Sequence, residues 1–314
     1  MNPNATEIVS DDPQDLPAPA CVMSFNASDA TGAGGVAGDI ATIAAMGAHA
    51  LPVISTIVMR DTAEIFEHTA LDPETVVEQA RSVLEDVTIS AWKVGFLGNA
   101  ENVGAVAEIL SDYPDVPLVT YLPTLSWMDD EDEAAAYHDA LRELVLPQTL
   151  VLVGNQKTLT DFLLPDWDSE RPPSARELAV SAGKHGTQYV LVTGLQLPNN
   201  QVDNVLSSPQ GAITGEKFER FETSFIGAGD TLSASIAALL ATGQELHIAV
   251  SEALAFLDQS LDAGFRPGMG NVVPDRFFWA MPPEDEDGEG EGDEDILDAM
   301  TADIDSPTKP RSIH

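Results

Sequence analysis

The chain has 314 residues, of which 44% are hydrophobic, so it is long enough to bury a sizeable core. Its formal net charge of −38 at pH 7 would repel nucleic-acid phosphates and anionic lipid head groups, which disfavours both as partners. The single cysteine, Cys21, cannot form an internal disulfide, and this fits a reducing cytoplasm.

The two ends of the chain differ in composition from the rest. Residues 1–19 are acidic and contain prolines, and residues 284–314 are rich in Glu, Asp and Gly, so neither segment can bury a core. We therefore expect two disordered acidic ends around one folded domain at residues 20–283. No signal peptide or membrane-length apolar run is visible, and we expect a cytoplasmic protein without membrane contact.

Between the ends, short apolar strands alternate with amphipathic helices. Taken in chain order, strands are expected at 21–25, 49–58, 91–96, 117–121, 149–153 and 189–193, with helices at 35–46, 73–87, 102–110, 131–144, 158–164 and 174–185. This alternation predicts an α/β fold with a central, mostly parallel sheet and helices on both faces. Residues 202–206 and 213–223 are expected to add a small edge hairpin, followed by long helices at 229–242 and 246–263.

The most informative motif is Gly227-Ala228-Gly229-Asp230, which opens the helix expected at 229–242. A helix start offers unpaired N–H groups, and glycines let a phosphoryl group approach them closely. Asp230 at the same place could accept the proton of an attacking hydroxyl group. The alternative is that Asp230 only caps the helix and the glycines form an ordinary turn.

A second glycine-rich loop, Asn26 to Gly35, follows the first strand and opens the first helix. Open α/β sheets bind ligands at such carboxyl ends of strands. Asp39 lies one helical turn further on, where it is either a ligand-facing group or an exposed helix residue. The histidines and Cys21 show no ligand spacing, so no metal-binding residue is assigned.

Together, the two loops resemble those of the ribokinase-like superfamily. The similarity is closest to the hydroxymethylpyrimidine/phosphomethylpyrimidine kinases of thiamine biosynthesis, and it extends in collinear order over roughly residues 20–280. Further stretches that carry it are Trp92-Lys93-Val94-Gly95-Phe96-Leu97 and Gly268-Met269-Gly270-Asn271. The resemblance implies a ribokinase-like three-layer fold, ATP as phosphate donor, Mg²⁺ with K⁺ as a further candidate ion, a small-molecule substrate and a homodimer.

The resemblance also implies roles for individual residues. Asp230 would be the catalytic base, and Gly227, Ala228 and Gly229 would form the anion hole. The substrate pocket would be lined by Ala27, Asp29, Asp39 and Arg60, and the nucleotide would lie at Asn155, Thr193 and Gly194.

Several positions depart from the family pattern. The family usually has a cysteine where Asp230 stands. In this respect the chain instead resembles pyridoxal kinases and sugar kinases, which have an aspartate base there. Arg60 replaces a glutamine, and because Arg only donates and is always charged, the pocket is expected to favour an anionic substrate. The usual carboxylates are missing at Tyr121-Leu122-Pro123 and at Asn155-Gln156-Lys157-Thr158. A pyridoxal kinase and a catalytically weakened, ligand-binding relative therefore stay open as alternatives.

Overall fold

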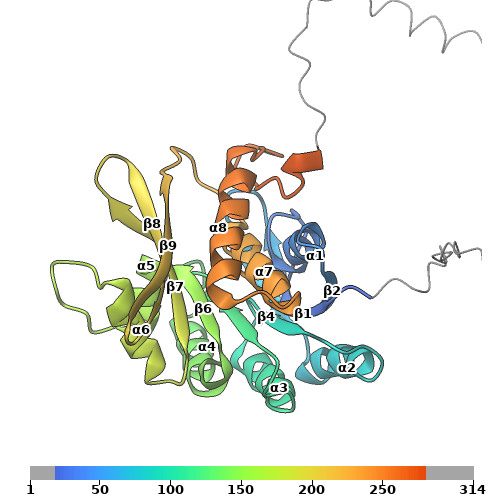
Figure 1. Cartoon of the computed structure of the whole chain (residues 1–314). Coiled ribbons are helices and arrows are strands. Elements are labelled where there is room, and N and C mark those ends of the chain that lie inside the picture. The colour runs from blue at the N-terminus through green and yellow to red at the C-terminus, as the bar shows by residue number, and fades with distance from the viewer. Residues whose placement is uncertain (1–17, 281–314) are drawn as a thin grey trace, which may run out of the picture. The chain divides into compact units, whose positions relative to one another are not determined.

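The structure is a computed structural model that describes residues 18–280. Apart from Ala18 and Pro19, the acidic ends expected at 1–19 and 284–314 lie outside the described residues. The described chain forms one nine-stranded sheet with the strand order β3-β2-β1-β4-β5-β6-β7-β8-β9 (Figure 1).

The sheet has a parallel centre and antiparallel edges. The parallel strands, from one side to the other, are β2 (His49–Arg60), β1 (Cys21–Asp29), β4 (Ala91–Val94), β5 (Leu118–Tyr121), β6 (Val151–Asn155) and β7 (Tyr189–Leu197). The antiparallel strands are β3 (Ile65–Ala70) beside β2, and β8 (Gln201–Ser208) and β9 (Gly211–Glu219) beyond β7. The mostly parallel sheet is confirmed, with its edge hairpin at β8 and β9; strand β3 was not expected.

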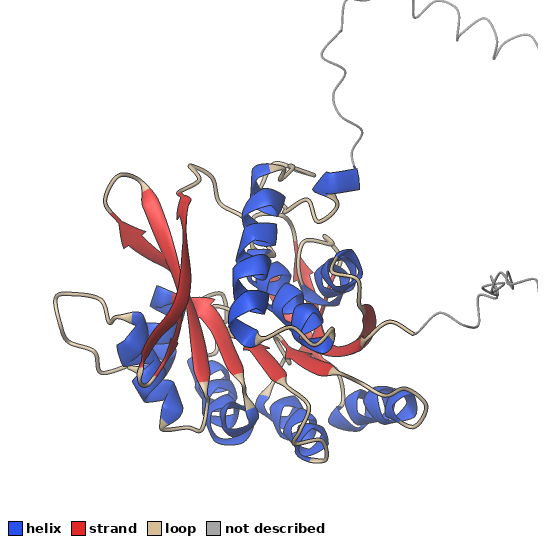
Figure 2. Cartoon of the chain, in the orientation of Figure 1, coloured by secondary structure: helices blue, strands red, loops and turns tan. Residues whose placement is uncertain are grey.

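Helices cover both faces of the sheet, as predicted (Figure 2). One layer holds α2 (Pro73–Leu84), α3 (Ala100–Ser111), α4 (Glu131–Ala140), α5 (Gln156–Leu163) and α6 (Ala175–Gly183). The other layer holds α1 (Gly35–Ala45), α7 (Ala228–Ala241) and α8 (Leu246–Asp262). A π-helical turn (Leu141–Val145) and two 3-10 turns (Leu146–Gln148 and Phe278–Ala280) complete the described helices, none of which is long and apolar enough to cross a membrane.

Local sequence signals explain where two helices begin. Asp72 caps α2 by accepting a hydrogen bond from the Glu74 amide at 2.9 Å, and Pro73 occupies the first turn, where its missing N–H costs nothing. Ser174 and Glu177 form a reciprocal capping box at the start of α6.

Strand alternation explains how the sheet separates its two cores. Because neighbouring side chains on a strand point to opposite faces, Met23 and Phe25 of β1 pack with the α2–α6 layer, whereas Val22 packs with the layer of α1, α7 and α8. By the same alternation, the polar Ser24 and Asn26 face the latter layer. On β4, Trp92 and Val94 join the first core, which leaves Lys93 on the face of α1 and α7.

The position of a ligand crevice follows from the strand order. β1 lies between β2 and β4, so the chain leaves β1 in one direction and later continues on its other side. Such a reversal opens a crevice at the carboxyl ends of the two strands. The loops after β1 and β4 and the start of α7 meet at this end of the sheet, where the polar residues of both sequence motifs gather.

Candidate active site

A cavity of about 390 Å³ opens at the carboxyl ends of the central strands. It brings together two groups of predicted residues from distant parts of the chain: Ala27, Asp29 and Arg60, assigned to substrate, and Gly227 and Asp230, assigned to catalysis. The rest of its wall is largely apolar and aromatic, with Val58, Ile65, Phe96, Tyr121, Leu125, Trp127 and Phe225. An apolar pocket with a few convergent polar groups suits a small ring compound.

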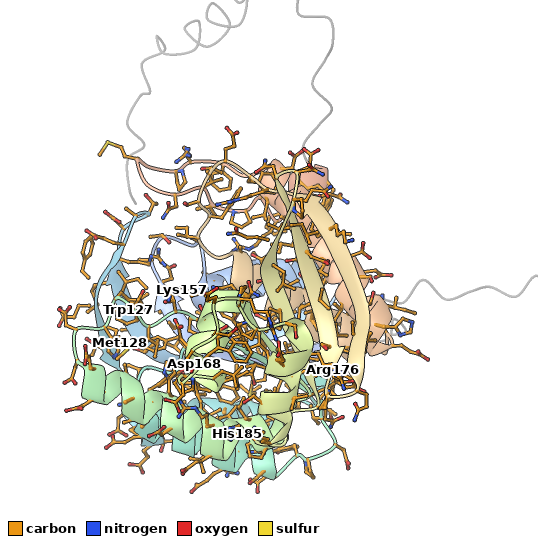
Figure 3. The ribbon with its side chains drawn as sticks, turned by 90° about the vertical axis from the view of Figure 1, so that its left-hand side faces the viewer. Trp127, Met128, Lys157, Asp168, Arg176 and His185 are labelled. Carbon is orange, nitrogen blue, oxygen red and sulfur yellow. The ribbon has the colours of Figure 1, made fainter. Side chains whose placement is uncertain are left out.

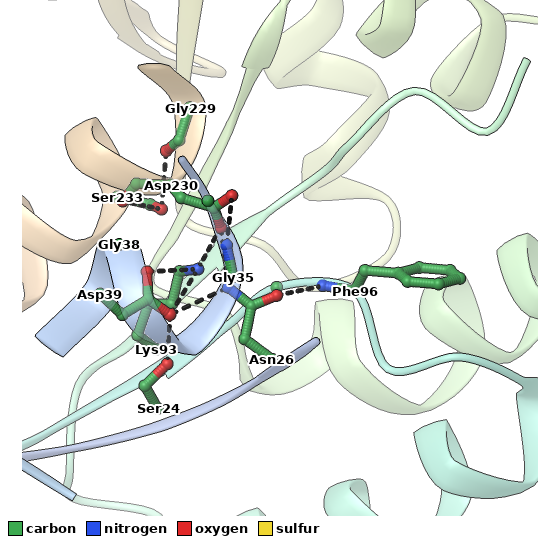
Figure 4. Close-up of polar contacts among 12 residues, drawn as sticks. Ser24, Asn26, Gly35, Gly38, Asp39, Lys93, Phe96, Gly229, Asp230 and Ser233 are labelled. Carbon is green, nitrogen blue, oxygen red and sulfur yellow. Dashed lines mark hydrogen bonds and ion pairs between the residues drawn. The ribbon is translucent and has the colours of Figure 1, made fainter. Parts of the chain in front are cut away.

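Asp230 lies in the first turn of α7 and is held by three hydrogen bonds (Figure 4). Its Oδ1 atom accepts from Lys93 Nζ at 2.7 Å and from Asn26 Nδ2 at 2.8 Å. Among the described residues, its Oδ2 atom accepts from the Gly35 amide alone, at 3.2 Å. The side chain is 14% exposed, so the carboxylate is fixed from below but remains accessible to the cavity.

The Asn26 side chain connects Asp230 to the two central strands. Its Oδ1 atom accepts from the Ala27 amide at 2.9 Å and from the Phe96 amide at 3.1 Å, while its Nδ2 donates to Asp39 and Asp230. A Cβ atom at Gly95 would lie 2.3 Å from Asn26 Oδ1, so the glycine after β4 makes room for this amide. These four contacts use both the carbonyl oxygen and the NH2 group of the Asn26 side chain within the protein.

Charge keeps Asp230 ionised. Burial alone would raise the pKa of Asp230, but Lys93, with the hydrogen bonds from Lys93, Asn26 and Gly35, lowers it below the ordinary value for aspartate. Burial would likewise lower the pKa of Lys93, yet Asp230 and Asp39 raise it above the ordinary value for lysine. The site therefore contains an ionised carboxylate that can accept a hydrogen bond.

The structure corrects the expected position of Asp39. Its side chain is fully buried beneath the cavity and does not line it, and it is not an exposed helix residue either. Asp39 accepts from Ser24 Oγ at 2.5 Å and pairs with Lys93 Nζ at 3.0 Å. The polar face of β1 and the lysine of β4 draw Asp39 inward, because a buried carboxylate needs donors around it. Burial raises its pKa, against the effect of Lys93.

The start of α7 is shaped for an anion. Gly227 has φ = +80°, a left-handed conformation that favours glycine, and a Cβ there would lie 1.7 Å from the Ala33 carbonyl oxygen. No described side chain caps α7, so its first amides, beginning with Ala228, have the orphan character of a helix start. Gly229 packs against Tyr121, where a Cβ would lie 2.2 Å from the ring. This geometry suits the developing charge of a phosphoryl group.

The residues assigned to the nucleotide lie at a second cleft, of about 430 Å³, at the ends of β6 and β7. Asn155 and Gly194 line it, together with Gln156, Lys157, Pro172, Leu195 and Gln196. Lys157 of this cleft and Trp127, which lines the first cavity, are labelled in Figure 3. Asn155 also caps α5 by accepting from the Thr158 amide at 2.9 Å. Thr193 is not part of the lining, and its hydroxyl donates to the Gly154 carbonyl at 3.3 Å.

Four polar residues around Asp230 were not assigned from the sequence: Lys93, Asn26, Ser24 and Arg276. The buried Arg276 guanidinium donates to Thr231 Oγ1 at 3.1 Å and to the Ala33 carbonyl, which ties the first glycine loop to α7. A signal existed for three of the four. Polar residues at every second position of β1, and a lysine in an otherwise apolar strand, indicate a polar strip on one face of the sheet.

No protein cage for a metal ion is found among residues 18–280. In this part of the chain, no three His, Cys, Asp or Glu side chains gather in a position to bind one ion. Mg²⁺ in phosphate-transferring sites is commonly held by substrate phosphates with one or two carboxylates. The described side chains thus do not by themselves form a Mg²⁺ site.

Comparison with known proteins agrees with this geometry. The sequence profile of the phosphomethylpyrimidine kinase family matches residues 29–275, which include both glycine loops and Asp230. The chain belongs to this family. The resemblance stated from the motifs is confirmed, and so is the expectation of a kinase of this type.

Individual relatives of this kinase family support the assignment. A hydroxymethylpyrimidine/phosphomethylpyrimidine kinase of Streptomyces coelicolor is 28% identical over 264 residues, which cover 84% of this chain and 96% of that protein. The thiamine biosynthetic bifunctional enzyme TH1 of Arabidopsis thaliana is 29% identical over 77% of this chain, but the match spans only 46% of that longer protein.

The fold is also found among solved structures. A pyridoxal kinase of Bacillus subtilis, solved as an ADP complex, superposes with a TM-score of 0.75 at 21% identity and covers 84% of this chain and 100% of its own. At this identity the likeness establishes the shared α/β fold alone. The ribokinase-like architecture expected for the family is thereby confirmed.

Proposed function

We propose that the chain is an ATP-dependent kinase that phosphorylates the hydroxymethyl group of 4-amino-5-hydroxymethyl-2-methylpyrimidine, its monophosphate, or both, in thiamine biosynthesis. The observation that carries the proposal is the position of Asp230. Its carboxylate lies where the ring-sized cavity meets the uncapped start of α7. A hydroxyl group in this cavity has a base and an anion-binding helix start beside it.

In this mechanism the cavity holds the substrate ring between apolar and aromatic side chains, with Arg60 available as a donor. Asp230 accepts the proton of the hydroxyl group as it attacks. The amides at Gly227 to Gly229 stabilise negative charge on the transferring group. ATP would supply the γ-phosphoryl group, with its phosphates extending toward the cleft at Asn155 and Gly194. No step is assigned to Mg²⁺ or K⁺.

The direct test is ADP release with Mg-ATP against hydroxymethylpyrimidine, its monophosphate, pyridoxal and ribose. We expect turnover with a pyrimidine, and a loss of kcat of roughly 10²–10⁴-fold in Asp230→Asn, the range that a general base contributes. Asp72→Asn is the matched control, because asparagine caps a helix as well as aspartate does and Asp72 lies at the start of α2.

The other outcomes each name an alternative. Turnover restricted to pyridoxal would mean that the substrate is pyridoxal and not a pyrimidine. Binding of these compounds without ADP release by the wild type would reject the kinase and favour the ligand-binding relative. The homodimer and the cytoplasmic location stay predictions, and sedimentation of the purified chain tests the former.

A further inference from the structure

Lys93 is a charged residue in the least favourable place for one. It lies on β4, all four of whose residues are buried between β1 and β5, and its side chain has 0% exposure. A buried ammonium group is costly unless it is paired and hydrogen-bonded. Lys93 Nζ lies 2.7 Å from Asp230 Oδ1 and 3.0 Å from Asp39, so it joins the base on α7 to a second carboxylate on α1 (Figure 4).

The two oxygens of Asp230 are therefore not equivalent. Oδ1 already accepts two hydrogen bonds, from Lys93 and Asn26, and both donors lie on the side of the sheet. Oδ2 has one donor, the Gly35 amide, at the longer distance of 3.2 Å. A carboxylate oxygen has two lone pairs, so Oδ2 keeps one for a further donor. Gly34 and Gly35 beside Oδ2 both line the cavity, and hence this oxygen is the one that a substrate hydroxyl meets.

Charged groups lie around Asp230 on several of the elements packed against it. β4 contributes Lys93, α1 contributes Asp39, and the segment after α8 contributes Arg276, whose carboxylate neighbours are Asp230, Asp39, Asp29 of β1 and Asp275. β5 contributes Tyr121, whose pKa burial and Asp230 raise above its ordinary value, so it stays neutral. Arg276 donates its hydrogen bonds to backbone carbonyls and to Thr231. Lys93 is thus the cation in direct contact with the base.

We propose that Lys93 is a positioning residue for the kinase: its ammonium group fixes Oδ1 of Asp230, so that Oδ2 faces the substrate hydroxyl group. Asp39 binds the same ammonium group. The inference rests on the proposed function for its catalytic meaning, but the contact between Lys93 and Asp230 can be tested without turnover.

The test is the titration of the Asp230 carboxyl group by ¹³C NMR in the full chain, with Asp230→Asn to assign its signal. In Lys93→Met we expect the midpoint to move to higher pH by roughly 1–3 units, the size of effect that an adjacent opposite charge has on an aspartate. In Asp39→Asn we expect the midpoint to stay close to that of the wild type, because burial raises the pKa of Asp39 and its carboxyl group is already protonated in the pH range where Asp230 titrates. Arg81→Met, which removes a surface cation paired with Asp112, should leave it unchanged.

Kinetics give the second measurement. The acidic limb of kcat/KM, below which Asp230 is protonated, should move up in Lys93→Met and stay in place in Asp39→Asn. On the plateau at higher pH, Lys93→Met should lower kcat and leave KM for ATP unchanged, because orientation is lost and nucleotide binding is not. A merely structural lysine would lower the melting temperature without moving either midpoint.

The outcomes separate the two proposals. Unchanged titration of Asp230 in folded Lys93→Met overturns the role of Lys93 even if the wild type is an active kinase. Should Lys93→Met fail to fold, the wild type decides, since a midpoint at or above that of an ordinary aspartate would contradict a carboxylate held by Lys93. A wild type without turnover on any substrate rejects the proposed function, and the titrations still show whether Lys93 holds the carboxylate.

Discussion

Arg60 lines the cavity at a position where the family resemblance leads us to expect a glutamine. Its Nη1 atom lies 3.7 Å from Asp29 Oδ2, and its Nε donates to the Asp61 carbonyl at 3.0 Å. Asp29 is itself held by the Thr31 hydroxyl and amide, so the pair is anchored in the loop after β1. The remaining guanidinium donors of Arg60 are available to the cavity, where they suit a phosphate or another anion.

Substitution of Arg60 by glutamine tests this preference. We expect Arg60→Gln to raise KM for the pyrimidine monophosphate by roughly 10–100-fold, because a hydrogen bond to a charged group contributes about 1.5–3 kcal/mol. KM for the unphosphorylated pyrimidine should change far less, so the ratio of the two KM values is the measurement. An equal change for both substrates would mean that Arg60 shapes the cavity without reading charge.

At the scale of one element, α7 has a left-handed glycine at each end, and the two have different surroundings. Gly227 precedes the helix with φ = +80°, and Gly243 follows it with φ = +89°. A Cβ at Gly227 would collide with the Ala33 carbonyl at 1.7 Å, whereas a Cβ at Gly243 meets nothing within 4 Å. Substitution of the two glycines therefore distinguishes the free-energy cost of a left-handed backbone conformation from the cost of displacing the start of the helix.

Alanine at the two positions should have unequal effects. Gly243→Ala should lose only the about 1–2 kcal/mol of stability that the left-handed conformation costs, and it should retain kcat. Gly227→Ala has the same conformational cost and must also push the loop at Ala33 away from α7, so it should lower kcat strongly as well. Thermal unfolding and ADP release of both variants are the measurements; equal kcat values would show that the start of α7 tolerates displacement.

How well the elements were predicted depends on their surroundings. The parallel core was predictable because its strands are apolar and its helices carry caps such as Asp72. Strand β3 was missed because it is a half-exposed edge strand, Ile65-Phe66-Glu67-His68-Thr69-Ala70, without a strict alternation. β1 was expected to end at Phe25 but continues to Asp29, because its polar residues are satisfied by groups from α1, β4 and α7.

The site shows the same division. The family resemblance assigned Ala27, Asp29 and Arg60 to the substrate and Gly227 and Asp230 to catalysis, and the structure brings these five residues to one cavity. Asp39 was expected at the pocket and Lys93 was not assigned, since only three-dimensional packing shows that Lys93 pairs with both Asp39 and Asp230. Spacing along the chain predicts which strand end a residue follows, but not how deep its side chain lies.

For the whole molecule, charge is the dominant property. The sequence has 52 acidic and 14 basic residues, and two of the basic ones, Lys93 and Arg276, are buried and cannot neutralise the surface. Mutual repulsion among the remaining carboxylates opposes the compact state. Salt screens this repulsion, because the Debye length falls from about 10 Å at 0.1 M to about 3 Å at 1 M.

We therefore expect the melting temperature to rise when KCl is increased from about 0.1 M to about 1 M at pH 7, by roughly 2–4 °C for each 1 kcal/mol of repulsion removed. The control is the same salt step near pH 4.1, the isoelectric point, where little net charge remains to be screened. An equal rise at both pH values would assign the effect to exclusion of salt from the surface.

The hydrogen bonds of Asp230 also bear on the order in which parts of the enzyme fold. Its partners Asn26, Gly35 and Lys93 precede it in sequence by 204, 195 and 137 residues. Such distant contacts form slowly, because a long loop must close before any of them is gained. During synthesis the three donors leave the ribosome long before α7. The hydrogen bonds to Asp230 can therefore form only after most of the sheet has been synthesised. Regain of activity on refolding should accordingly lag behind formation of the parallel core, and it should coincide with the docking of α7.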